Sequence, residues 1–530
     1  MPRALKSFHL LLLLLLGLLG HGFAKEPEWV EVRSPHFSVV TDAGERRGRE
    51  TALHFEQMRV VFGTLMSKSK VTLPVPLQIV AFRNTKEMRQ FVPLWNGKPT
   101  QVAGLFQGGS DRSFIMIDMS VEDPLEVVFH EYAHQLLNGN VPARLPLWFD
   151  EGFAEYFSTI KITGKQADVG LSSAWFGAML TQQRLMKVAD LFRVEHDSST
   201  YNESGDHRSI FYVESWLVFH YINDKQWMPK VVTYLNLAND RKLPVEEAIQ
   251  QAFGMSTADF DRELQQYILG RKILHYPVPV PEGIDNKDYS VKSLAAPEAK
   301  AVLADVHLHS QDYREQAMGE FKEVLKLQPD NAVALRGLGY GYLMKQDYQQ
   351  AGEYFGKAVE HDSTDPRVLY YSAVLAQREG LGGDRERLDV VQKQLEKSIA
   401  LDPDFADAYN ILAWAQMASG DHEKALQTML KAMNLDPRNE SYAYNLGQMY
   451  FMNRKYDEAI AIWRPLTSGT NFALARQAAE AITTAENIKQ FAQSGTKVEI
   501  LVDNDVQKEP ETSTPIPPAV TGPAKFLKGN

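Results

Sequence analysis

Apolar and polar positions divide the chain into a first part of mixed periodicity and a second part of helical periodicity. In the first part, short apolar or alternating runs predict four strands, at Trp29–Val32, Phe37–Val40, Pro76–Phe82 and Ser113–Asp118. Apolar residues recur at helical spacing from Glu45 to Met66, and the pattern after the fourth strand is helical. The glycines of Gln107–Asp111 predict a hairpin loop before the last strand. We therefore expect an α+β section over residues 25–270.

The second part repeats itself at a fixed period. Ala317 and Ala351 are 34 residues apart, and so are Ala425 and Ala459. A large apolar residue follows each alanine by four positions, at Phe321, Phe355, Met429 and Trp463. This pattern resembles the tetratricopeptide repeat, in which helical hairpins stack into an all-α solenoid. We count about five units over residues 295–485, the third lengthened near Gly380–Asp384, and expect a protein partner in the solenoid groove.

Two segments are predicted to lie outside the folded parts, one as a linker and one as a tail. Residues 271–294 contain Pro277, Pro279 and Pro281, which predicts a linker. Because no candidate catalytic residue lies beyond this linker, we expect the first part to keep its chemistry without the repeats. Residues 486–530 include the run Pro515–Pro518 and are predicted to form a disordered tail.

The N-terminus has the pattern of a targeting signal. Arg3 and Lys6 precede a leucine-rich run, and Ala24 follows at a position suited to cleavage. The run is too short for an ordinary membrane span, so residues 1–24 are predicted to be a cleaved signal peptide, with an uncleaved anchor as the alternative. No later run is long enough to span a membrane, so the chain is expected to be exported without a transmembrane segment.

Composition narrows the partners and the chemistry. The formal net charge of −11 argues against nucleic acid as the main partner. The chain has no cysteine, which excludes disulfides, a thiol nucleophile and cysteine-ligated metals. Any metal must therefore be held by histidines and carboxylates. An exported chain without cysteine fits a bacterial periplasm or exterior better than a disulfide-forming secretome.

An HExxH motif supplies the candidate chemistry. His130 and His134 are one helical turn apart, so both imidazoles can reach one ion. Glu131 is rotated by about 100° from His130 and can address a water beside that ion as a general base. A metzincin would need Gly at position 137 and His at position 140, but the chain has Leu137 and Asn140.

A second helical segment offers two carboxylates. Glu151 and Glu155 are four residues apart, hence on one helix face. Gly152 and Ala154 are small, which predicts a close approach to the HExxH helix. Two histidines and one glutamate form a ligand set of catalytic zinc enzymes that leaves one position open.

The HExxH motif and the Glu-Gly-x-Ala-x-Tyr string resemble the gluzincin metallopeptidases of the peptidase MA-like group. The resemblance implies a zincin-like fold over roughly residues 29–270, with one Zn²⁺ per chain bound by His130, His134 and Glu151. It implies that Glu155 orients a ligand histidine, although Glu155 could exchange roles with Glu151. Tyr212 is the candidate for stabilising an oxyanion, the alternative being an ordinary core tyrosine.

The resemblance implies a secreted zinc endopeptidase that cleaves peptide bonds in protein or peptide substrates. The predicted strand from Phe114 to Ile117 would be the cleft edge along which an extended substrate pairs. Two alternatives stay open. One is an aminopeptidase, although the chain has no Gly-x-Met-Glu-Asn run; the other is an interaction scaffold whose peptidase fold is silent.

Overall fold

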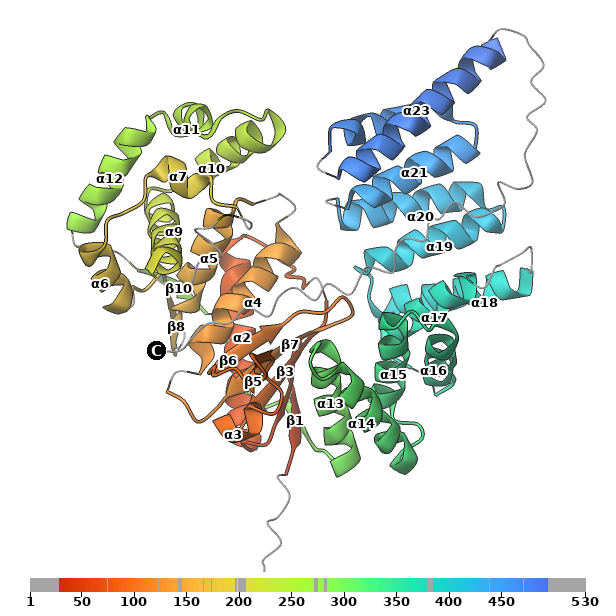
Figure 1. Ribbon diagram of the computed structural model, residues 1–530, viewed down its shortest axis with the longest axis horizontal. Coiled ribbons are helices and arrows are strands. Elements are labelled where there is room, and N and C mark those ends of the chain that lie inside the picture. Colours follow the sequence, from red (N-terminus) through yellow and green to blue (C-terminus); the bar gives the residue numbers. More distant parts are fainter. Residues whose placement is uncertain are drawn as a thin grey trace, which may run out of the picture.

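The protein is described by a computed structural model, in which a mixed section of strands and helices is followed by an all-helical solenoid (Figure 1). The structure describes residues 28–493, apart from 74, 123, 142–144, 165, 173, 196–197, 199–205, 271–274, 281–283, 362, 379–384, 438 and 470. The predicted signal peptide 1–24, the lengthened loop at Gly380–Asp384 and the predicted tail beyond residue 493 therefore lie outside the described residues.

A six-stranded sheet organises the first part, with the strand order β11-β1-β2-β3-β7-β6. Its strands are β1 (Val30–Arg33), β2 (Ser38–Thr41), β3 (Leu77–Phe82), β6 (Gly104–Gln107), β7 (Ser113–Asp118) and β11 (Ser290–Ser293). Strands β2, β3 and β7 run parallel, and the other pairings are antiparallel. The four strands and the hairpin loop predicted from the sequence are confirmed, each strand to within about two residues.

Side chains alternate between the two faces of this sheet, so both faces carry apolar cores. Val39, Ile79 and Ile115 point to a core shared with helices α2 (Glu45–Leu65) and α4 (Leu125–Asn140). Their neighbours Val40, Val80 and Phe114 point to a second core. Helix α3 (Thr85–Met88) and helix α13 (Ala296–His309) contribute to that second core, so the sheet is covered on both sides.

The rest of the first part is mainly helical and packs beyond α4. Its helices are α5 (Leu147–Ser158), α6 (Ala174–Gln182), α7 (Val188–Phe192), α9 (Asp206–Asp224), α10 (Met228–Leu235), α11 (Val245–Phe253) and α12 (Thr257–Leu269). A hairpin is formed by β4 (Leu94–Trp95) and β5 (Lys98–Pro99). A small sheet is formed by β8 (Lys161–Thr163), β9 (Gln166–Val169) and β10 (Tyr276–Pro279). Helices α6 to α12 lie on the far side of the sheet from the solenoid (Figure 1).

The solenoid consists of helical hairpins stacked in chain order. The paired helices are α13 with α14 (Arg314–Leu327), α15 (Ala332–Met344) with α16 (Tyr348–Glu360), α17 (Pro366–Arg378) with α18 (Arg385–Leu401), α19 (Ala406–Ala418) with α20 (His422–Leu435), and α21 (Glu440–Met452) with α22 (Tyr456–Trp463). Helix α23 (Phe472–Gln493) packs on the last pair. Residues 486–493 are therefore helical, in contrast to the predicted start of the tail at residue 486.

The interior of the solenoid follows the period seen in the sequence. The four large residues of the repeat, Phe321, Phe355, Met429 and Trp463, are all buried between neighbouring helices. Within the described part of the chain, no helix combines the length and the apolar character needed to cross a bilayer.

The described residues of the segment predicted to be a linker contribute two strands to the sheets of the first part. Strand β10 pairs with β9, and strand β11 pairs with β1 at the edge of the large sheet. Strand β10 is an outer strand of its sheet, so its backbone is paired on one side only. Pro277 and Pro279, which have no backbone N–H to donate, are compatible with such a strand. Helix α13 follows β11 directly and covers the second face of the large sheet. The expected separation of two independent modules is therefore not found.

The loop between β6 and β7 also joins the two parts, because it reaches the first helices of the solenoid hairpins (Figure 1). The polar pairs across this contact include Ser110 with Tyr340, Asp111 with His309, and Arg112 with Asp365. A side chain at Gly109 would place its Cβ 2.5 Å from the His309 ring, so only glycine permits this approach. We call residues 107–112 the β6–β7 loop below.

Candidate functional site

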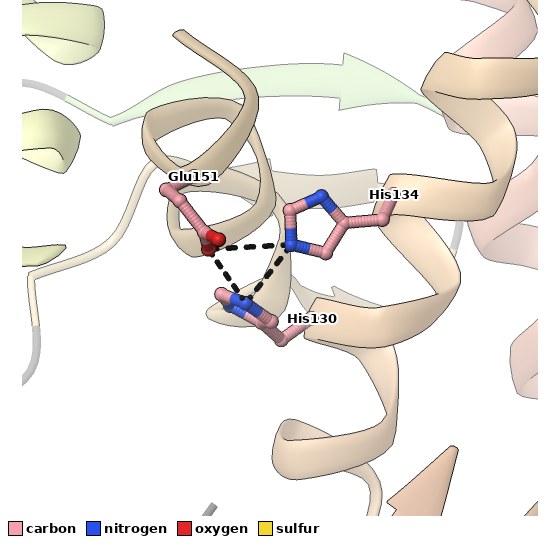
Figure 2. Close-up of side chains that lie close together, drawn as sticks. All are labelled: His130, His134 and Glu151. Atoms are coloured by element: carbon pink, nitrogen blue, oxygen red, sulfur yellow. Dashed lines mark hydrogen bonds and ion pairs between the residues drawn. The ribbon is translucent and has the colours of Figure 1, made fainter. Parts of the chain in front are cut away.

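Helices α4 and α5 bring the two motif histidines and one of the two carboxylates together (Figure 2). Glu151 Oε2 lies 3.2 Å from His130 Nε2 and 3.3 Å from His134 Nε2. The two Nε2 atoms are 3.2 Å apart. All three side chains are buried, and among the described residues they form the one group whose ligand atoms could hold a metal ion together.

The spacing of these three atoms can be tested against a zinc ion. A tetrahedral site with bond lengths of about 2.0–2.1 Å places neighbouring ligand atoms about 3.3 Å apart. The three measured separations, 3.2, 3.2 and 3.3 Å, match that value. Two imidazoles and one carboxylate are also a donor set that zinc accepts, so the residues present fit the ion.

A second set of carboxylates holds the outer ring nitrogens. His134 Nδ1 lies 2.7 Å from Asp150 Oδ1, and His130 Nδ1 lies 3.3 Å from Glu155 Oε1. Because a carboxylate accepts, each Nδ1 carries a proton, which leaves each Nε2 as the ring atom that could bind a cation together with Glu151. Asp150 was not predicted from the sequence. The signal available was an acidic residue directly before the proposed ligand, at the start of the second helix.

Burial and charge act in opposite directions on the two histidines. Burial lowers the pKa of His134, but Asp150 and Glu151 outweigh it and raise the pKa to about 9. Burial likewise lowers the pKa of His130, while Glu155 and Glu151 raise it well above its ordinary value. The carboxylates thus create a negative electrostatic potential at the two imidazoles. This potential favours positive charge there, either as protons on the rings or as a bound cation.

Helix α9 packs on α5 and delivers Tyr212 to the site. The ring of Tyr212 lies 6.1 Å from that of His130, between centroids, and its side chain is buried. Gly152 permits this packing, because a Cβ there would lie 2.3 Å from the Ser215 carbonyl oxygen of α9. The small residue predicted to serve the approach to the HExxH helix therefore serves the approach of α9 instead.

Glu131 occupies the same helix turn as His130 and is only 4% exposed. Its Oε1 atom has no hydrogen-bond partner among the described residues. A buried carboxylate oxygen without a partner calls for an explanation, and a catalytic role is one of those known. Five predicted site residues thus lie at or next to the two imidazoles, and Glu131 lies in the same turn of α4 as His130.

The sheet edge beside this site differs from the prediction. Strand β7, which contains Phe114 to Ile117, is paired on both sides, with β3 and with β6. It therefore has no free edge to offer to a substrate strand. The edge on this side of the sheet is β6, which also contacts α4.

Comparison with known families divides the chain in the same way. Residues 125–246 match a family described as a protein of unknown function (DUF1570), and this range contains every predicted site residue. That description names no activity. Residues 302–366 match the tetratricopeptide repeat, and residues 393–465 match the anaphase-promoting complex, cyclosome, subunit 3. The repeats predicted from the sequence are thereby confirmed.

Curated relatives share a limited stretch. The chain is 31% identical over 125 residues to U-box domain-containing protein 70 of Oryza sativa subsp. japonica, covering 24% of this chain and 15% of that protein. It is 28% identical over 128 residues to Hsp70-Hsp90 organizing protein 3 of Arabidopsis thaliana, covering 24% of this chain and 22% of that protein. The chain thus spans less than a quarter of either relative.

Solved structures give weak likenesses. YrrB, described as a TPR protein with an unusual peptide-binding site, has 20% identity and a TM-score of 0.30, over 34% of this chain and 91% of its own. The first TPR of Spaghetti (RPAP3), bound to an HSP90 peptide, has 20% identity and a TM-score of 0.20, over 23% of this chain and 94% of its own.

Proposed function

We propose that the chain is an exported zinc-dependent endopeptidase whose tetratricopeptide solenoid recruits protein partners or substrates. The single observation that carries the proposal is the convergence of His130 Nε2, His134 Nε2 and Glu151 Oε2 at 3.2–3.3 Å. Their donor types and spacing fit one zinc ion, which supplies Lewis acidity for activating a water and polarising a carbonyl. The zincin-like fold and the gluzincin resemblance belong to this proposal.

Each neighbouring residue then has a defined task. Glu131 accepts a proton from the attacking water and returns it to the leaving amine, as its partnerless Oε1 permits. Asp150 and Glu155 hold the Nδ1 protons and so fix the orientation of both imidazoles. Tyr212 donates its hydroxyl proton to the oxygen on which charge develops. The edge of β6 offers backbone groups to an extended substrate.

The second candidate is an interaction scaffold without catalysis. It is favoured by the comparisons, because the confirmed module is a tetratricopeptide array and the relatives named above include a protein described as organizing Hsp70 and Hsp90. Stacked helical hairpins of this kind provide extended surfaces for proteins or peptides. Under this candidate the histidine–glutamate group would serve folding alone.

Metal analysis and a casein assay of the full-length protein separate these candidates. We expect one zinc per chain, and turnover that falls by about 10² or more in Glu131→Gln with zinc and fold retained. Glu246→Gln makes the same change at an exposed position and should leave turnover unchanged. Zinc without any turnover would support the scaffold, and absence of zinc would contradict the proposed site. Cleavage of a peptide with a blocked N-terminus distinguishes an endopeptidase from an aminopeptidase.

A further inference from the structure

A cavity of about 400 Å³ lies on the side of α9 that faces away from the histidine–glutamate group. Helix α12 and the connection from α6 to α7 form its other walls. Its volume is within the range of small-molecule sites, about 300–1,000 Å³. The apolar part of its wall includes Leu180, Leu185, Val188, Leu217, Leu264 and Ile268.

Glu214 is the polar residue that α9 contributes to this cavity. It follows Tyr212 by two positions, which is about 200° of helix rotation, so the two side chains leave α9 on opposite sides. The residue is only 3% exposed. Its Oε1 accepts the Met186 backbone N–H at 2.6 Å, whereas its Oε2 is buried with no hydrogen-bond partner among the described residues.

No basic side chain among the described residues of the cavity wall compensates a negative charge on Glu214. Burial raises its pKa to about 8, the Met186 amide lowers it in part, and the Asp261 carboxylate raises it further. The basic residues at the cavity wall are Lys187 and Arg184. Lys187 Nζ is 3.3 Å from Asp261 Oδ2 and reaches solvent, and Arg184 is exposed. Neither basic group contributes to the pKa of Glu214.

We propose that this cavity binds a small primary amine with an apolar chain, its ammonium group on Glu214 Oε2. An ammonium at that atom would supply a hydrogen-bond donor and, once the carboxyl group is ionised, an opposite charge. The apolar chain would lie against Leu217, Leu264 and Ile268, where each methylene removed from water favours binding. The site is separate from the proposed zinc group and does not depend on peptidase activity.

Calorimetric titration of the full-length protein at pH 8 tests this assignment. The probes are n-hexylamine, hexan-1-ol and hexanoate, which differ in the head group and share the chain length. We expect hexylamine to bind at least about tenfold more tightly than hexanol, and hexanoate to give no measurable binding. Glu214→Gln should weaken hexylamine binding by about tenfold or more and leave hexanol binding unchanged.

Two further variants keep the test decisive. Glu246→Gln removes the same charge at an exposed residue and should leave hexylamine binding unchanged. Ile268→Trp fills the cavity from a half-buried position and should weaken binding of both hexylamine and hexanol. Equal affinities for amine and alcohol, an unchanged affinity in Glu214→Gln, or amine binding that disappears on zinc chelation would each overturn the proposal.

Discussion

His309 Nε2 lies 2.7 Å from Asp111 Oδ1, and this pair ties the first helix of the solenoid to the β6–β7 loop. His309 Nδ1 meets the Asp305 carbonyl oxygen at 2.7 Å. Both ring nitrogens therefore face acceptors, an arrangement that favours the charged imidazole. Burial lowers the pKa of His309, but Asp111 and Asp305 outweigh it and raise the pKa. A buried ion pair is thus one of the contacts between the two parts of the chain.

Breaking this ion pair on one side should destabilise the whole protein. His309→Leu leaves the Asp111 carboxylate buried without its main partner, and we expect the free energy of unfolding to fall by about 3 kcal/mol. The double variant with Asp111→Asn should lose less than the sum of the two single losses. Urea denaturation measures all three. His361→Leu, at an exposed position of the same solenoid, should change stability by less than about 0.5 kcal/mol. Strict additivity would show that the two residues do not interact.

Truncation should show that the first part needs the start of the solenoid. A chain ending at Leu269 loses strand β11 and helix α13, which exposes the second face of the large sheet. We expect this chain to aggregate. A chain ending at Ser419 keeps the β6–β7 loop contacts and retains α19 as an end helix. It should stay soluble and bind zinc as the full chain does. Gel filtration and metal analysis compare the two truncated chains. A soluble, zinc-loaded chain ending at Leu269 would show that the first part folds without the start of the solenoid.

The carboxylates around the histidines should differ in their effect on zinc retention. Glu151→Gln should strip the ion, because it replaces a direct ligand. Asp150→Asn and Glu155→Gln should weaken zinc affinity by about 10–100-fold, because they orient the imidazoles. Asp190→Asn, at an exposed residue, is the control. Competition with a chelator gives the affinities. Zinc lost in Glu155→Gln and kept in Glu151→Gln would reverse the assignment.

Glu214 should make stability depend on pH. Burial raises its pKa in the folded state to about 8, above the ordinary value of 4.5. Between these two pH values the folded state keeps the Glu214 proton, whereas the unfolded state has lost it. The free energy of unfolding should therefore fall as pH rises from about 4.5 to about 8. Glu214→Gln removes this titration. Between pH 5 and pH 8, its free energy of unfolding should therefore rise relative to that of the wild type by a few kcal/mol, on the order of 1.4 kcal/mol per unit of pKa shift. Urea denaturation at pH 5 and pH 8 measures the difference; parallel changes in both proteins would contradict it.

The features that could be predicted from the sequence are those determined by local periodicity and motif spacing. The strand at Pro76–Phe82, the helix from Glu45 and the facing of His130 and His134 all follow from neighbours a few residues apart. The structure also brings Glu151 Oε2 to 3.2 Å from His130 Nε2, and the Tyr212 ring to 6.1 Å from the His130 ring. Pairing between distant segments leaves no local pattern, which explains the remaining differences.

Three of those differences share this cause. Strand β11 is short and largely polar, and it is a strand only because the edge of β1 receives it. Strand β6 begins with a glycine and has no alternation of apolar and polar residues, so the sequence predicts β7 as the sheet edge. Asp150 gains its role from the angle at which α5 meets α4, a property of the packed pair rather than of either helix.

The β6–β7 loop acts as an intrachain ligand of the solenoid. It contacts helices α13 and α15 and the residue that precedes α17, so the first three hairpins already hold a peptide segment. A covalently attached segment is present at an effective concentration that a free peptide rarely matches. An external partner that binds at these hairpins would have to displace this loop. A solenoid prepared on its own would expose a vacated site at its first hairpins, and peptides selected against it would report an affinity that the whole protein does not have.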